Sequence, residues 1–227
     1  MSASRRLILP ILFGLVGAAI LVGLGVWQLQ RLHWKQGILA EIEAKISADP
    51  VGLPIAPNVK DNKYLPVTIV GRLTGKEAHV LTSQKELGPG YRVIAGLETT
   101  DGRRVMVDLG FVSESDLGSP RPVGSITVTG NLHWPAEVDS FTPPHDITRD
   151  IWFARDVVPM AQALQTEPVL LVARATDPIL PAIVPLPVDS AGIANDHLQY
   201  AITWFSLAIV WLGMTVLLVW RIRQRAV

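Results

Sequence analysis

The sequence of 227 residues contains no cysteine. This absence excludes thiolate copper sites, iron–sulfur clusters, thioether-linked haem and a cysteine nucleophile. The five histidines show no H-E-x-x-H or other recognised metal spacing, and the sequence has no G-x-S-x-G, Walker or G-x-G-x-x-G motif. No catalytic constellation stands out, so we do not expect an enzyme.

Charged residues are absent from two long apolar stretches, residues 7–30 and Leu198–Trp220. Each stretch is at least as long as the roughly 20 residues that a helix needs to cross hydrocarbon. We therefore predict two transmembrane helices over residues 7–30 and 197–220, with a domain at 31–196 between them and short tails at 1–6 and 221–227.

The basic residues of the tails predict the orientation in the membrane. Five arginines lie in the tails and no acid does, so the tails carry +5 and, because the net charge is 0, the middle carries −5. Short basic tails stay in the cytoplasm. We predict a two-span protein of a bacterial inner membrane, with cytoplasmic termini and a periplasmic central domain. A cleaved signal peptide is the alternative for residues 7–30, but the apolar run is longer than a typical h-region and no small-residue cleavage site follows it.

The middle segment begins with a helical pattern and continues with strand patterns. Trp34, Ile38, Ile42 and Ile46 recur at four-residue spacing, which predicts a short amphipathic helix continuing from the first span. Runs rich in Val, Ile, Leu, Thr and Tyr then predict β-strands. These runs are Tyr64–Leu73, Ala78–Ser83, Tyr91–Glu98, Arg104–Val112, Ser125–Leu132 and 167–174.

Three further segments complete the expected domain. "TTDGRR" predicts a hairpin turn, and Ala154–Leu164 predicts a short helix. The four prolines of residues 177–196 predict an extended surface segment outside any central strand ladder. We expect an α+β domain dominated by an antiparallel sheet, with a small barrel as one form that the sheet can take.

Two polar features of the strands need structural explanations. "GPG" at residues 88–90 predicts a turn before Tyr91 and Arg92, which either only feeds the strand or forms a partner-contacting loop. Asp108 lies within an apolar strand, and a buried carboxylate needs a partner. We expect that partner to be Arg92 or Arg104, with a structural role for Asp108.

Four segments together resemble the Surfeit-locus family of cytochrome c oxidase assembly proteins, known in yeast as Shy. "GVWQLQRLHWK" matches the family pattern G-x-W-Q-x-x-R-x-x-x-K at the outer end of the first span. "GPGYRVI" and "VMVDLGFV" are similar to its two central motifs, and "NDHLQYAITWF" to its entry into the second span. Leu109 departs from the family, in which an arginine is expected between the Asp and the Gly, so we expect no charge role at this position.

The resemblance implies a role in building the haem–copper terminal oxidase and, in bacterial members, binding of haem a. Haem needs an axial ligand, an apolar slot and cations for its propionates. The residues that can supply these lie at the outer ends of the two spans, with His197 as the axial ligand of the haem iron and four neighbours as haem-binding groups: Trp27, Arg31, Tyr200 and Trp204. Opposite chain directions bring the two groups of residues to one membrane depth, and Tyr200, Trp204 and Trp211 lie roughly on the face of His197.

Each of these residues also has an interpretation without haem. Tyrosines and tryptophans gather at membrane interfaces in any case, and His197 beside Asp196 can face water at the start of a helix. Arg31 can simply set the depth of its helix. His79, His133 and His145 are expected to be solvated or at the edge of the core, whereas His33 lies close to the membrane beside Trp34 and is the next candidate for the ligand. In the first span Gly14 with Ala18, and Ala19 with Gly23, form small-xxx-small patterns of the kind that permit close helix packing.

The leading hypothesis is a non-enzymatic assembly factor that holds haem a between its synthesis and its insertion into oxidase subunit I. The expected partners are subunit I, haem a synthase and the lipid bilayer, with no nucleic acid. One alternative is a scaffold for oxidase assembly that never carries haem. Another is a two-span membrane sensor with an exported ligand-binding domain.

Overall fold

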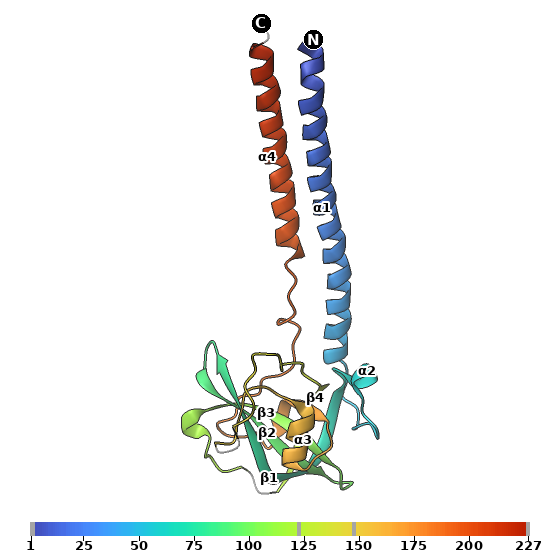
Figure 1. Ribbon diagram of the computed structural model, residues 1–227. Coiled ribbons are helices and arrows are strands. Elements are labelled where there is room, and N and C mark those ends of the chain that lie inside the picture. Colours follow the sequence, from blue (N-terminus) through green and yellow to red (C-terminus); the bar gives the residue numbers. More distant parts are fainter. Residues whose placement is uncertain (1–2, 122–123, 147–148, 226–227) are drawn as a thin grey trace. The chain divides into compact units, whose positions relative to one another are not determined.

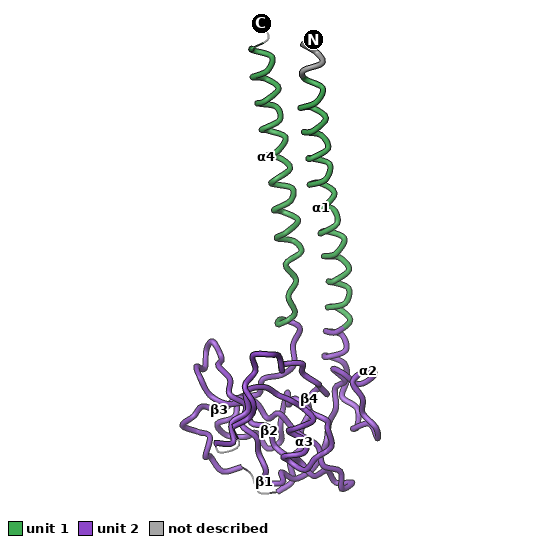
Figure 2. Tube along the Cα trace, in the orientation of Figure 1, with its two compact units in different colours: residues 1–41, 191–227 green, residues 42–190 purple. Residues whose placement is uncertain are grey.

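The computed structural model describes residues 3–121, 124–146 and 149–225. The chain divides into two compact units, which Figure 2 colours separately: residues 1–41 with 191–227, and residues 42–190. The first unit contains the apolar parts of two long helices, α1 (Ala3–Ile46) and α4 (His197–Gln224). Both are long and apolar enough to cross a membrane, and α1 runs without interruption to Ile46, which confirms the predicted helical continuation.

The second unit is a small β-barrel with short helices (Figure 1). Its strands are β1 (Pro66–Gln84), β2 (Gly88–Thr99), β3 (Arg104–Ser113), β4 (Ser125–His133), β5 (Ile151–Trp152) and β6 (Leu170–Asp177). The helical elements are α2 (Val59–Asn62), the 3₁₀ helix η1 (Glu114–Asp116) and α3 (Val157–Leu164).

Five strands close a ring in the order β1–β2–β3–β6–β4, with β4 returning to β1. The β3–β6 pair is parallel and the other four pairs of the ring are antiparallel, while β5 adds a short parallel pairing to β1. The expected sheet class and its barrel form are therefore confirmed. Closure leaves no free edge along the ring, which removes the unpaired backbone groups of an open sheet.

Alternation along the strands places one set of side chains inside the barrel. Val105, Val107 and Leu109 of β3 join the interior cluster, whereas Met106 packs with α3 on the other face. Successive residues of a strand point to opposite faces, so this central strand is covered on both sides. The interior cluster also includes Leu180 and Ile183 of the return segment.

That packing corrects the expected surface position of residues 177–196. After Asp177, which ends β6, the described segment forms no ladder, as its prolines predict, and its one bridge joins Val184 to Phe111. However, Leu180 and Ile183 are only 5% and 7% exposed. The apolar side chains between the prolines are buried in the core because they cover apolar surface that the short strands leave open.

Two strand boundaries also differ from the predictions. Tyr64–Leu73 and Ala78–Ser83 are parts of one strand, β1, which continues through a bulge between Leu73 and Glu77. Gly75 has a φ of +80° there, so the glycine bends the strand instead of ending it.

The "GPG" residues belong to β2, and the turn lies before them at residues 85–87. A Cβ on Gly90 would lie 2.6 Å from the Phe111 ring, so this glycine permits close packing and is not a turn residue. The predicted Asp-Gly hairpin is confirmed, with Gly102 at a φ of +83° between β2 and β3.

Candidate functional site

The predicted axial ligand His197 is the first residue of α4 and is half-buried. Its Nδ1 lies 2.8 Å from Oε1 of Gln28 in α1. With the amide oxygen as the acceptor, the tautomer that satisfies this contact is the one with its proton on Nδ1, which leaves the lone pair on Nε2. Histidines that bind metals are held in this way through the nitrogen that does not coordinate. The geometry therefore fits His197 as a ligand through Nε2.

Small residues allow the two helices to approach and form this hydrogen bond. A Cβ on Gly25 would lie 2.7 Å from the Phe205 ring, and one on Gly14 would collide with the Thr215 side chain. Trp211 donates its indole N–H to the Gly14 carbonyl oxygen at 3.0 Å. Helices that have glycine or other small residues at their contact can pack closely, as is common in membrane proteins.

Only one of the two predicted small-residue patterns is in this contact. Gly14 and Ala18 are buried, whereas Ala19 is exposed and nothing lies within 4 Å of a Cβ built on Gly23. On α4, the buried residues Ala201 and Ala208 lie four and eleven residues after His197 and so share its face.

The other predicted site residues lie within about two turns of His197 or Gln28 along their own helices. Trp27 and Tyr200 are 51% and 55% exposed, and Trp204 is half-buried. Arg31 stacks over the Trp34 ring, with the guanidinium carbon 4.3 Å from the ring centroid. Trp211, which shares a predicted face with His197, packs on Gly14 and Phe13 instead.

Gln28 is the partner that sequence reasoning missed. It is a half-buried polar residue in a run without formal charge, and its position within "GVWQLQRLHWK" was a usable signal. An apolar cavity of about 390 Å³ between α1 and α4 lies elsewhere, since Leu15, Leu212 and Arg223 line it, well along both helices from His197.

The remaining histidines have local partners. His33 Nδ1 lies 2.8 Å from the Leu29 carbonyl oxygen, and His145 stacks on Trp152 with ring centroids 3.9 Å apart. His79 is near Glu77 and Asp150. Across the described residues, no group of three or more histidines and acids is arranged to hold a metal ion.

A buried charge network lies on the outer face of the barrel. Asp108 is 0% exposed and accepts hydrogen bonds from Arg92 Nε at 2.8 Å and from Arg155 Nη1 at 3.1 Å. Arg155 also binds Glu137, and Arg92 donates to the Leu186 carbonyl oxygen at 2.8 Å. The network thus ties the loop before α3 and the return segment to the barrel wall.

The network explains two pKa shifts. Burial would raise the pKa of Glu137, but hydrogen bonds and the charge of Arg155 outweigh it and hold this pKa below its usual value. Burial, with the nearby positive charge of Arg155, lowers the pKa of His133 to about 4. His133 is therefore neutral at physiological pH.

Two predictions about this region can now be compared with the structure. Arg92 is a partner of Asp108 as expected, but Arg104 is not, because it pairs with Glu98. Leu109 is fully buried in the barrel interior, at the bulge where β3 shifts register against β2. A charged side chain would be costly at this position, which agrees with the absence of a charge role here.

The chain is similar to known proteins over most of its length. The model of the SURF1 family matches residues 15–209. Surfeit locus protein 1 of Rattus norvegicus is 28% identical over 209 residues, covering 82% of this chain and 67% of the relative. The SURF1-like protein of Drosophila melanogaster is 30% identical over 221 residues, covering 86% and 73%.

A bacterial relative is similar over almost its whole length. The SURF1-like protein of Rickettsia felis is 29% identical over 210 residues, which cover 86% of this chain and 90% of the relative. The family match includes the barrel and the parts of α1 and α4 next to it. The chain therefore belongs to the SURF1 family, as a bacterial member.

Proposed function

We propose that this chain assists assembly of the haem–copper terminal oxidase by holding haem a as cargo at His197 and helping its insertion into subunit I. Membership of the SURF1 family supports the role in cytochrome c oxidase assembly. In this proposal the chain is a carrier and not an enzyme, and its direct partners are subunit I and haem a synthase.

The observation that carries the haem proposal is the hydrogen bond between His197 and Gln28. An imidazole that is fixed through Nδ1 presents Nε2 in a defined direction. A histidine that served only to begin a helix would need no such partner from α1. Because Gln28 is uncharged, it orients the ring without adding charge in an apolar setting.

The neighbouring aromatic residues suit the edge of a macrocycle. Trp27 and Tyr200 expose about half of their surface, which leaves ring faces free to stack on a flat apolar ligand. The Trp204 ring is the third candidate packing group. Arg31 lies over the Trp34 ring, and in this proposal its guanidinium N–H groups donate to a propionate.

The proposed topology follows from the tails. Basic tails at both ends favour cytoplasmic termini, which puts His197 and the barrel domain on the periplasmic side of a bacterial inner membrane. A site at this depth would receive haem from a membrane enzyme and present it to another membrane subunit without passage through water.

The test is to co-express the full chain with a haem a synthesis pathway, purify it in mild detergent and record its visible spectrum and haem content. We expect near-stoichiometric haem a in the wild type and a large loss in His197→Ala. His33→Ala is the matched control, since His33 is a neighbouring histidine that bonds only within α1. Equal melting temperatures would show that both variants are folded.

Two other outcomes lead to different conclusions. Haem retained by His197→Ala but lost from His33→Ala would move the ligand to His33. No haem in any of the proteins, in cells that make haem a, would refute the carrier and favour a scaffold that binds subunit I through its barrel domain.

A further inference from the structure

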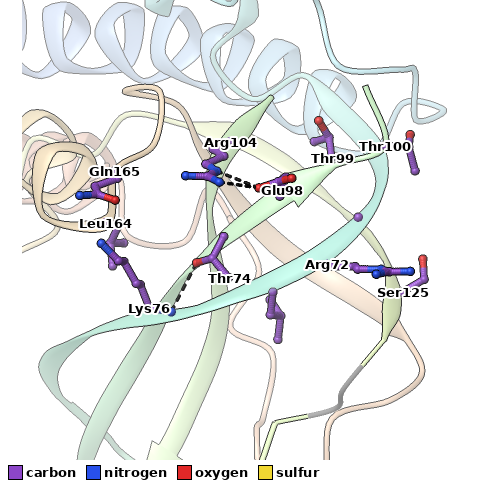
Figure 3. Close-up of a pocket in the computed structure, with 12 residues that line it drawn as sticks. Arg72, Thr74, Lys76, Glu98, Thr99, Thr100, Arg104, Ser125, Leu164 and Gln165 are labelled. Atoms are coloured by element: carbon purple, nitrogen blue, oxygen red, sulfur yellow. Dashed lines mark hydrogen bonds and ion pairs between the residues drawn. The ribbon is translucent and has the colours of Figure 1, made fainter. Parts of the chain in front are cut away.

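A polar cavity of about 590 Å³ opens on the barrel where β1 bends (Figure 3). Its lining includes three cationic side chains and one acidic side chain, with the hydroxyl groups of three threonines and one serine. All of its residues belong to the barrel unit, so this cavity is separate from the proposed haem site.

Strand register explains how the charged groups come together. Arg72 of β1 pairs in the sheet with Glu98 of β2 on one side and with Ser125 of β4 on the other, and Glu98 pairs in turn with Arg104 of β3. Directly opposed residues project from the same face of a sheet. A row of polar side chains therefore crosses four neighbouring strands.

The bulge in β1 forms the end of the cavity that lies away from Arg72. Lys76 follows Gly75 in the bulge and lines the cavity together with Leu164 of α3, whereas Arg72 lines it beside its sheet partner Ser125 (Figure 3). Opposite the bulge, Gly96 has no side chain, and a Cβ there would lie 2.6 Å from Thr74 Oγ1. Arg72 and Lys76 thus lie at separate ends of the same cavity.

The charges in the cavity are not balanced. Arg104 donates from Nε and Nη2 to the same Glu98 oxygen, each at 2.8 Å, so this pair is neutral as a unit. The side chains of Arg72 and Lys76 make no ion pair or hydrogen bond with any residue that the structure describes. Together they leave two positive charges without a counter-charge in the hollow.

We propose that this cavity binds a ligand with two carboxylate groups, one at Arg72 and the other at Lys76. The guanidinium fork matches a carboxylate, lysine supplies a point charge, and the hydroxyl groups can donate to the remaining oxygens. Most of the lining residues are polar or charged, which favours a polar ligand. A small dicarboxylic acid and a protein segment with two acidic side chains offer the same chemistry.

The test uses the full-length protein in a neutral detergent at low ionic strength, where charge contacts are least screened. Isothermal titration calorimetry would measure binding of glutarate, of a short peptide with two glutamates, and of glutaramide as the uncharged control. We expect saturable binding of glutarate, of the peptide or of both, but not of glutaramide. Arg72→Gln and Lys76→Gln should each weaken binding by about tenfold.

Lys85→Gln is the matched control, because Lys85 is an exposed cation in the turn at residues 85–87, outside the cavity. Binding of the peptide alone would identify a partner's acidic segment as the ligand, and binding of glutarate would show that a free small acid fits. No binding of either acid, or equal weakening in Lys85→Gln, would overturn the proposal. The test requires no haem, so its result is independent of the carrier function.

Discussion

The charge network around Asp108 gives the sharpest prediction about stability. Asp108→Asn keeps the size of the side chain but removes the charge that Arg92 and Arg155 face at 2.8 and 3.1 Å. Both arginines are largely buried, so water cannot replace the lost carboxylate. Removing one member of a buried ion pair costs about 3–5 kcal/mol. At roughly 2–4 °C per kcal/mol, the melting temperature should fall by ~6–20 °C.

The exposed pair of Arg104 and Glu98 supplies the control on the same sheet. Its side chains are 50% and 46% exposed, and exposed ion pairs contribute only about 0–1 kcal/mol. Thermal unfolding of the full chain in mild detergent, followed by circular dichroism in the β-sheet region, would compare Asp108→Asn with Glu98→Gln. If the two variants melt within about 3 °C of each other, the buried network does not stabilise the barrel as argued.

Three further predictions concern other parts of the molecule. The pKa of His133 is lowered to about 4 in the folded chain. Between pH 6.5 and 4 the unfolded chain therefore binds more protons than the folded chain. The free energy of unfolding should fall by up to about 2 kcal/mol as the pH drops through this window. His133→Phe should flatten the pH profile of the melting temperature over that range, and an unchanged profile would assign the acid sensitivity to other groups. Gly14→Val should lower the free energy of unfolding of the detergent-solubilised protein by about 1–3 kcal/mol, and with it the melting temperature, because the new side chain meets Thr215. Gly23→Val has open space around it and should have no effect. Gln28→Ala should weaken haem a binding by about 10–100-fold while the fold is kept; wild-type affinity in this variant would show that the bond to His197 does not orient the ligand.

The sequence indicated which residues are candidates for the proposed haem site, but it did not indicate their contacts. Its apolar stretches set the two spans, and opposite chain directions set the common depth of Trp27 and His197. The hydrogen bond from Gln28 depends on the rotation of α1 about its axis. That rotation is set by the residues of α1 that meet α4. One of them is Gly25, whose missing side chain leaves room for the Phe205 ring.

The buried charge network around Asp108 likewise combines a partner that the sequence indicated with one that it did not. Whatever the fold, an aspartate that is buried in an apolar strand requires a cation as its partner, because an unpaired buried charge is too costly. Arg92 and Arg104 were the two candidates that the sequence offered. Arg155 was not among them, since it comes from a loop 47 residues further along the chain, and no periodicity in a loop indicates where it will pack.

The sequence by itself therefore determined the two apolar helices, the class of the sheet and the hairpin at Gly102, since each follows from local composition, alternation or a turn residue. Only the tertiary structure decided the closure of the ring, the burial of Leu180 and Ile183, and the gathering of Arg72 and Lys76 in one cavity. The physical reason is that strand order and register are chosen by the total apolar surface that the closed barrel buries, a quantity that belongs to no single segment.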